Sequence, residues 1–92
     1  MLQLNLSKQA ERFLLSLTSK DNVRVVQKIE ELLSDPFPYH SIQMKGNFKS
    51  CRRIKAGSKI RIVYQAENGI LSIFAIGYRA DIYKKFPPQD SP

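Results

Sequence analysis

The pattern of apolar residues changes its period at Pro36 and Pro38, and this change constrains the fold more than any other feature. Before the two prolines, apolar residues recur at the three- and four-residue spacing of amphipathic helices. After them, apolar and polar residues mostly alternate, as they do in β-strands. Proline lacks a backbone donor and fixes φ, so a helix cannot continue through this pair. The sequence therefore predicts a helical first half and a sheet-forming second half.

The first half predicts one short strand and two helices. Residues 2–6 alternate leucine with polar residues, which is typical of a half-buried strand, and Ser7 is a suitable N-cap for the helix that follows. The helical stripe that starts at Ala10 ends at the polar cluster 18–21, and a second stripe runs to about Ser34. We expect the two helices to form a hairpin with one apolar side.

The second half predicts three antiparallel strands, over residues 48–56, 59–66 and 70–77. The pair Gly57-Ser58 supplies the first turn, and Asn68-Gly69 is a strong signal for a type I′ hairpin. The third strand is apolar on both faces, which is typical of a central strand. Residues 78–86 predict a short C-terminal helix.

This order of elements predicts an α+β fold, in which one sheet carries an N-terminal strand, a helical hairpin, a three-stranded antiparallel part and a short C-terminal helix. The 92 residues suit one domain, which we expect to span 1–92 with a frayed end at 87–92. The single Cys51 excludes an internal disulfide. No signal peptide or membrane span is visible, so we expect a cytoplasmic protein without a membrane partner.

The net charge of +7 indicates an anionic partner: nucleic acid, a membrane surface or an acidic protein. The ordinary alternative is a solvated surface that happens to carry many lysines. The positions of the cations have to decide between these interpretations.

The first hairpin of the sheet gathers cations on one face. We expect residues 56–58 to form its loop, which places Lys55 opposite Lys59. The same register places Arg53 opposite Arg61. Like charges paired across strands oppose folding by roughly 0.2–1 kcal/mol per pair, so selection for stability alone would not gather them. The cluster therefore favours a function in binding anions.

Four stretches of the sequence resemble the RelE/ParE toxin superfamily: Met44 to Gly46, Cys51 to Lys55, Ile60 to Tyr64 and Gly77 to Tyr83. Their order is closest to the RelE branch, whose members cut messenger RNA in the ribosomal A site. The resemblance implies a RelE-like fold and a toxin of a type II toxin–antitoxin system that acts as an endoribonuclease on translated messengers. It also implies an acidic antitoxin that folds on binding, the ribosome and mRNA as partners, and no metal or cofactor.

The resemblance also assigns residues. The catalytic positions of RelE-type toxins fall on Arg53, Lys55, Arg61, Arg79 and Tyr83. The ribosomal RNA would add phosphate contacts for further lysines, among them Lys45, Lys49, Lys59, Lys84 and Lys85. Two positions depart from the family pattern: Tyr78 stands where many relatives carry histidine or lysine, and Arg53 stands where the best-known branch has lysine.

Metal-free RNA cleavage by the 2′-hydroxyl needs a proton acceptor, a proton donor and positive charge on the phosphate. Arginine stays protonated, so it can stabilise charge but cannot act as a base. Lys55 and Tyr83 are the two candidates for the base, because surrounding cations disfavour a protonated lysine and favour a phenolate. Tyr83 could instead stack on a base. The single His40 is interpreted as a surface residue in a loop.

Two other functions remain open. One is inhibition of DNA gyrase without RNA cleavage, as in the ParE branch. The other is a catalytically inactive module that only binds an antitoxin or RNA. The codon preference does not follow from the sequence.

Overall fold

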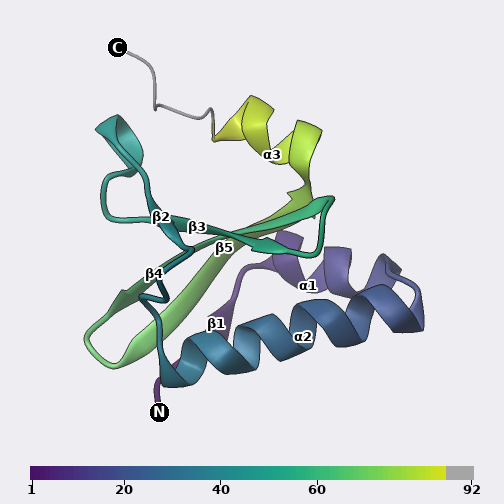
Figure 1. Cartoon of the computed structure of the whole chain (residues 1–92), viewed down its shortest axis with the longest axis horizontal. Coiled ribbons are helices and arrows are strands. Elements are labelled where there is room, and N and C mark those ends of the chain that lie inside the picture. Colours follow the sequence, from purple (N-terminus) through teal and green to yellow (C-terminus); the bar gives the residue numbers. More distant parts are fainter. Residues whose placement is uncertain (87–92) are drawn as a thin grey trace.

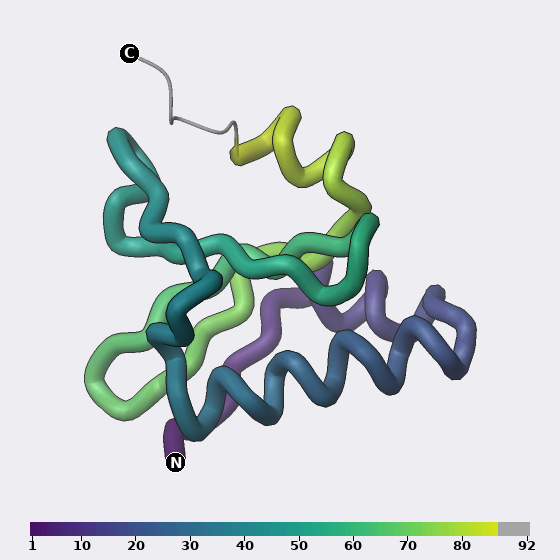
Figure 2. Tube along the Cα trace, viewed as in Figure 1, coloured from purple at the N-terminus to yellow at the C-terminus, as the bar shows by residue number. Residues whose placement is uncertain are grey.

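A five-stranded sheet organises the chain, and the computed structural model describes residues 1–86 (Figures 1 and 2). The elements in chain order are β1 Gln3–Leu6, α1 Lys8–Ser16, α2 Ser19–Ser34, β2 Ile42–Gln43, the 3-10 turn η1 Gly46–Phe48, β3 Arg52–Ala56, β4 Ile60–Glu67, β5 Ile70–Tyr78 and α3 Arg79–Lys85. The sheet order is β1-β5-β4-β3-β2. Strand β1 runs parallel to β5, and the other neighbouring pairs are antiparallel. The expected frayed end at 87–92 lies outside the described residues.

The expected α+β class and the order of its elements are confirmed. Strand β5 lies between β1 and β4, as its apolar faces predicted. Two details differ: the short strand β2 was not predicted, and β3 begins at Arg52 rather than near Phe48. The backbone N–H of Cys51 donates to the carbonyl of Phe48 at 2.8 Å. This contact closes a turn just before β3, which keeps residues 48–51 out of the sheet.

Side-chain caps start both long helices. Ser7 Oγ accepts a hydrogen bond from the N–H of Ala10 at 3.1 Å, which confirms the predicted cap of α1. Thr18 Oγ1 accepts from the N–H of Asp21 at 3.4 Å. The polar cluster 18–21 therefore begins the second helix at once, rather than forming a longer loop.

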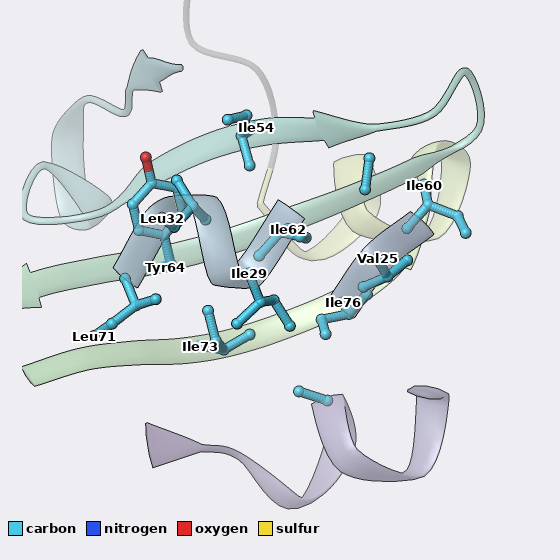
Figure 3. Close-up of a cluster of buried hydrophobic side chains, with 12 residues drawn as sticks. Val25, Ile29, Leu32, Ile54, Ile60, Ile62, Tyr64, Leu71, Ile73 and Ile76 are labelled. Atoms are coloured by element: carbon cyan, nitrogen blue, oxygen red, sulfur yellow. The ribbon is translucent and has the colours of Figure 1, made fainter. Parts of the chain in front are cut away.

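The larger core lies between the sheet and the pair α1 and α2, which cover the same face (Figures 1 and 3). Figure 3 shows Val25, Ile29 and Leu32 of α2 beside Ile62 and Ile73 of the sheet. Complete burial of one such aliphatic side chain contributes about 1.5–3 kcal/mol. This core fixes the face of the sheet that α1 and α2 cover, so these two helices leave the opposite face uncovered.

Helix α3 covers part of that other face (Figure 1). A smaller core lies beneath it, made of Met44, Cys51, Val63, Ala75 and Ile82. The C-terminal segment is thereby held over the central strands, where its side chains can meet those of β3 and β4. Over residues 1–86, none of the helices combines the length and the hydrophobicity that a bilayer-spanning helix requires.

Positive φ angles occur in both hairpin turns of the sheet. Asn68 and Gly69 have φ of 55° and 78°, which confirms the predicted type I′ turn. Gly57, between β3 and β4, has φ of 86°. A Cβ added at Gly57 would lie 2.9 Å from Cδ of Arg24, whereas nothing lies within 4 Å of one added at Gly69.

The substitution Gly57→Ala is expected to lower the free energy of unfolding more than Gly69→Ala does. Both substitutions force alanine into the left-handed region, at a cost of about 1–2 kcal/mol. Only alanine at Gly57 must also displace the side chain of Arg24. Urea denaturation of the two variants measures the difference, and adding Arg24→Ala to Gly57→Ala should remove it. Equal losses in the two single variants would contradict this account.

Candidate functional site

The pairing of β3 with β4 differs from the predicted register. The sequence predicted Lys55 opposite Lys59 and Arg53 opposite Arg61. In the structure Lys55 lies opposite Arg61, and Arg53 lies opposite Val63. Both predicted cross-strand pairs are therefore wrong.

The position of the turn explains the difference. Gly57 is the residue that tolerates a positive φ, so the turn covers residues 57–59. Ala56 remains in β3 and pairs with Ile60. Moving the loop by one residue changes every pairing by two, and a shift of two leaves each side chain on its original face. Lys59 leaves the strand and lies in the turn.

The cations of β3 and β4 still converge on one face. With α3 and the segment before β3 they surround a cavity of about 50 Å³. We call this the cationic cavity; it is lined by His40, Ile42, Arg53, Ile54, Lys55, Arg61 and Tyr83. Pockets that enclose drug-sized ligands are typically ~300–1,000 Å³. The cationic cavity therefore suits one small anionic group of a ligand that lies across the surface.

Arg61 forms the floor of the cationic cavity. Its side chain is buried, with 3% of the residue exposed. Nη1 donates to the carbonyls of Ser58 at 3.1 Å and Ile60 at 3.0 Å, and Nε donates to Oη of Tyr83 at 3.4 Å. All three acceptors are neutral oxygens, and a buried charge without a counter-charge costs stability. The arrangement holds a guanidinium in place with its positive charge available to a ligand.

Tyr83 of α3 forms the wall of the cationic cavity that this helix contributes. Cζ of Arg53 lies 5.0 Å from the centroid of its ring, within the range of a cation–π contact. Burial alone raises the pKa of the Tyr83 phenol. The hydrogen bond from Arg61 and the positive charges of Arg53, Arg61 and Arg79 outweigh this, so the pKa lies below its ordinary value of 10.0. At a given alkaline pH the site therefore holds a larger fraction of phenolate than an unperturbed tyrosine would.

The remaining predicted residues lie around the cavity rather than in it. Arg79 begins α3 and is exposed; its charge reaches Tyr83, but its side chain lines a neighbouring groove with Lys59. The structure thus brings together four of the five predicted catalytic residues, with the fifth beside them. The lysines expected to contact RNA are all exposed: Lys45 and Lys49 flank η1, Lys59 lies in the turn, and Lys84 and Lys85 end α3.

Sequence reasoning missed His40 and Ile42 as cavity residues. His40 is exposed and lies in a loop, as expected, yet it lines the cationic cavity. Its Nε2 lies 3.4 Å from Nζ of Lys28 on α2. Ile42 reaches the cavity because β2 pairs with β3, which places it opposite Arg53. No motif in the sequence indicates a two-residue strand, so the sequence carries no signal that Ile42 lies at the cavity.

Arg52, on the other face of β3, and Cys51, just before β3, have structural partners. Arg52 donates from Nε to Oγ of Ser41 at 2.9 Å, and its Cζ lies 5.3 Å from the ring centroid of Phe37. Cys51 is buried in the smaller core; burial raises the pKa of its thiol, and a hydrogen bond with Ser50 offsets this only in part. Neither residue contributes a reactive group to the cationic cavity.

The positive charge of the site is not neutralised from within. Across residues 1–86 the ion pair within 4.0 Å is Lys28–Glu31 on α2, and it involves none of the cavity arginines. In the same part of the chain, no group of three or more histidine, cysteine, aspartate or glutamate side chains is arranged to hold a metal ion. The arrangement can bind a phosphate group by charge-assisted hydrogen bonds and can stabilise additional negative charge on it.

Comparison with known proteins agrees with this architecture. Residues 4–83 match the model of one protein family, described as the ParE toxin of the type II toxin–antitoxin system, parDE. No curated protein sequence matches the chain.

Solved structures share the fold, and three of them are compared with this chain. The isolated E. coli RelE toxin is 21% identical, with a TM-score of 0.72, over 92% of this chain and 94% of that one. The archaeal RelE–RelB complex from Pyrococcus horikoshii OT3 gives 20% identity and a TM-score of 0.72, over 85% and 94% of the two chains. YafQ from E. coli strain BL21(DE3) gives 17% identity and a TM-score of 0.72, over 90% of this chain and 99% of that one. At these identities the likeness concerns the fold.

Proposed function

This chain belongs to the family of ParE toxins of type II toxin–antitoxin systems, and from that premise we propose that it is an endoribonuclease that cuts messengers on the ribosome. The observation that carries the proposal is the cationic cavity, where Arg53, Lys55 and Arg61 meet Tyr83 around a space that suits a single phosphate. The fold it shares with the RelE toxin supports the same assignment. Ribosomes and messengers would place its action in the cytoplasm.

In the proposed reaction the ribose 2′-oxygen of the messenger attacks the adjacent phosphorus. A bond from the 2′-oxygen to phosphorus forms, and the bond from phosphorus to the 5′-oxygen of the next nucleotide breaks. The products are a 2′,3′-cyclic phosphate and a 5′-hydroxyl. One proton must leave the 2′-hydroxyl and another must reach the 5′-oxygen. The guanidinium groups of Arg53 and Arg61 stabilise the negative charge that develops on the phosphate.

Of the two candidates for the base, the geometry supports Tyr83. The lowered pKa of its phenol raises the fraction of phenolate, and the hydrogen bond from Arg61 orients its oxygen in the cationic cavity. The ring already contacts Arg53 on one side, which makes Tyr83 a poorer surface for stacking. Lys55, opposite Arg61 and exposed at the cavity, is then available as the proton donor to the 5′-oxygen. Arginine can take neither role.

We further propose a cognate antitoxin that covers the cationic cavity. The E. coli RelBE structure and the archaeal RelE–RelB structure are toxin–antitoxin complexes with this toxin fold. A net charge of +7, with Lys28–Glu31 as the ion pair found among residues 1–86, attracts an acidic segment that folds on binding. Such a segment would exclude the messenger from the cavity.

A second candidate function is inhibition of a topoisomerase without cutting RNA. The observation that favours it is the description of the matching family as ParE toxins of parDE systems. Against it stands the cavity itself, because a phenol with a lowered pKa beside a buried arginine supplies a base and charge stabilisation, which inhibition by binding alone does not require.

Induction of the protein in cells, followed by mapping of messenger 5′ ends, is expected to reveal new ends with 5′-hydroxyl groups inside translated codons. The mapping should be repeated after translation initiation is blocked, which should remove these ends because the ribosome arranges the substrate. Activation of DNA-damage signalling without new messenger ends would instead support the topoisomerase candidate. Absence of both, with no growth arrest, would indicate an inactive binding module.

A further inference from the structure

A groove that shares no lining residue with the cationic cavity opens at the end of the sheet. It lies between the β3–β4 turn and the start of α3 and has a volume of about 550 Å³. Its lining residues are Ser58, Lys59, Tyr78, Arg79 and Ala80. The backbone N–H of Arg79 donates to the carbonyl of Lys59 at 2.7 Å, which joins the two walls. The relative positions of Lys59 and Arg79 are therefore held by the backbone.

Tyr78 presents an aromatic surface in this groove. The residue is 45% exposed although it ends β5, which lies between β1 and β4. The ring of Phe13 on α1 packs against it edge to face, with centroids 5.2 Å apart and an angle of 74° between the planes. An edge-to-face neighbour holds the orientation of the tyrosine ring while the ring keeps exposed surface. Tyr83, by contrast, has the guanidinium of Arg53 over its ring.

The groove also carries positive charges that can contact the phosphate of a nucleotide. Lys59 and Arg79 are exposed beside Tyr78, and Arg79 is also close enough to lower the pKa of Tyr83 in the cationic cavity. Arg79 therefore links the two places. Asp21 and Arg24 of α2 line an adjoining hollow of about 230 Å³. Lys59 and Tyr78 line this hollow too, so the positive charges of Arg24 and Lys59 exceed the single negative charge of Asp21 there.

We propose that Tyr78, Lys59 and Arg79 form a nucleotide subsite for single-stranded RNA next to the cleavage position. One base stacks on the ring of Tyr78, and its phosphate contacts Lys59 and Arg79. An aromatic ring between cations is the arrangement that binds single strands with little sequence preference. The inference rests on the proposed function, since it extends the path of the messenger from the cationic cavity across Arg79. It assigns substrate binding to Tyr78, whose side chain lies outside that cavity.

The test measures binding of a single-stranded oligoribonucleotide that carries the fluorescent base 2-aminopurine. Each position that could be cut carries a 2′-deoxyribose, so the probe is not cleaved. Stacking on tyrosine quenches the fluorescence. Tyr78→Leu is expected to weaken binding by about tenfold, because one base–aromatic contact is lost. Tyr78→Phe and Tyr78→Trp should bind within about twofold of the wild type, because both retain a stacking surface. Lys59→Ala should reduce the slope of log affinity against log salt by about one unit.

The matched control is Phe74→Leu. Phe74 lies on the same strand with a similar exposed fraction, 41%, and does not line the groove. Its substitution should leave binding and quenching unchanged. Wild-type affinity in Tyr78→Leu would overturn the inference, and so would equal weakening in Tyr78→Leu, Tyr78→Phe and Tyr78→Trp, which would assign Tyr78 to packing against Phe13. Failure of the wild type to bind the oligonucleotide would overturn it as well.

Messenger cleavage on programmed ribosomes separates this inference from the function on which it rests. If the wild type cuts messengers but Tyr78→Leu binds and cuts as the wild type does, the subsite fails alone. If the wild type does not cut messengers but its RNA binding depends on Tyr78, the cleavage proposal fails and the binding site stands. With both correct, Tyr78→Leu should raise KM about tenfold with a smaller change in kcat, because stacking contributes to binding.

Discussion

Arg61→Met is expected to lower the rate of messenger cleavage by a factor of at least about 100 without lowering the melting temperature. Methionine can occupy the space of the arginine stem but cannot donate hydrogen bonds to a phosphate. Arg61 is 3% exposed and its acceptors are neutral oxygens, so the native protein bears the cost of burying this charge. Removing the charge offsets the loss of those hydrogen bonds. Cleavage on programmed ribosomes and thermal unfolding by circular dichroism measure the two effects.

Arg52→Met is the matched control, because it removes an arginine from the neighbouring strand on the other face. Arg52 bonds to Ser41 and lies over Phe37, so the substitution should cost about 1–3 kcal/mol of stability and leave cleavage intact. Arg61→Met should therefore lose cleavage and keep its melting temperature, whereas Arg52→Met should keep cleavage and lose stability. A clear drop in melting temperature in Arg61→Met, with cleavage retained, would mean that Arg61 serves to hold the β3–β4 turn.

Tyr83→Phe is expected to lower cleavage by about 100-fold or more, the range for loss of a general base. It should also change the dependence on pH. Because the phenol pKa lies below 10, the wild-type rate should rise with pH up to that lowered pKa and then level off. In Tyr83→Phe this rise should disappear. Single-turnover rates on programmed ribosomes across alkaline pH provide the measurement.

Stability gives an independent check on Tyr83. Folding lowers the pKa of the phenol below its unfolded value, so the ionised side chain favours the folded state. The wild type should gain stability over Tyr83→Phe as the pH rises from the lowered pKa toward 10, and the gain should be lost as the pH falls through the lowered pKa. Tyr39→Phe is the control, since Tyr39 is 100% exposed and lies outside the cationic cavity. If the cleavage rate of Tyr83→Phe still rose with pH as in the wild type, Lys55 would become the candidate base.

The local structure was largely predictable from short-range patterns. Ser7 caps α1, and Asn68-Gly69 makes a type I′ turn, because both signals act within a few residues. The common face of Arg53, Lys55 and Arg61 was also predictable, although the register was wrong, because alternation along a strand survives a shift of two residues. The resemblance, rather than any spacing, directed attention to Arg79 and Tyr83.

Apart from β2 and the start of β3, the sequence by itself determined which segments become helices and strands and which residues share a face, because hydrophobic period and turn chemistry are local properties. Tertiary structure alone decided that α3 lies over the cations, that Arg61 is buried beneath Tyr83, and that β2 brings Ile42 to the cavity. These features depend on contacts between residues far apart in the chain. Burial and pKa follow from the complete packing around a side chain, and no local pattern specifies that packing.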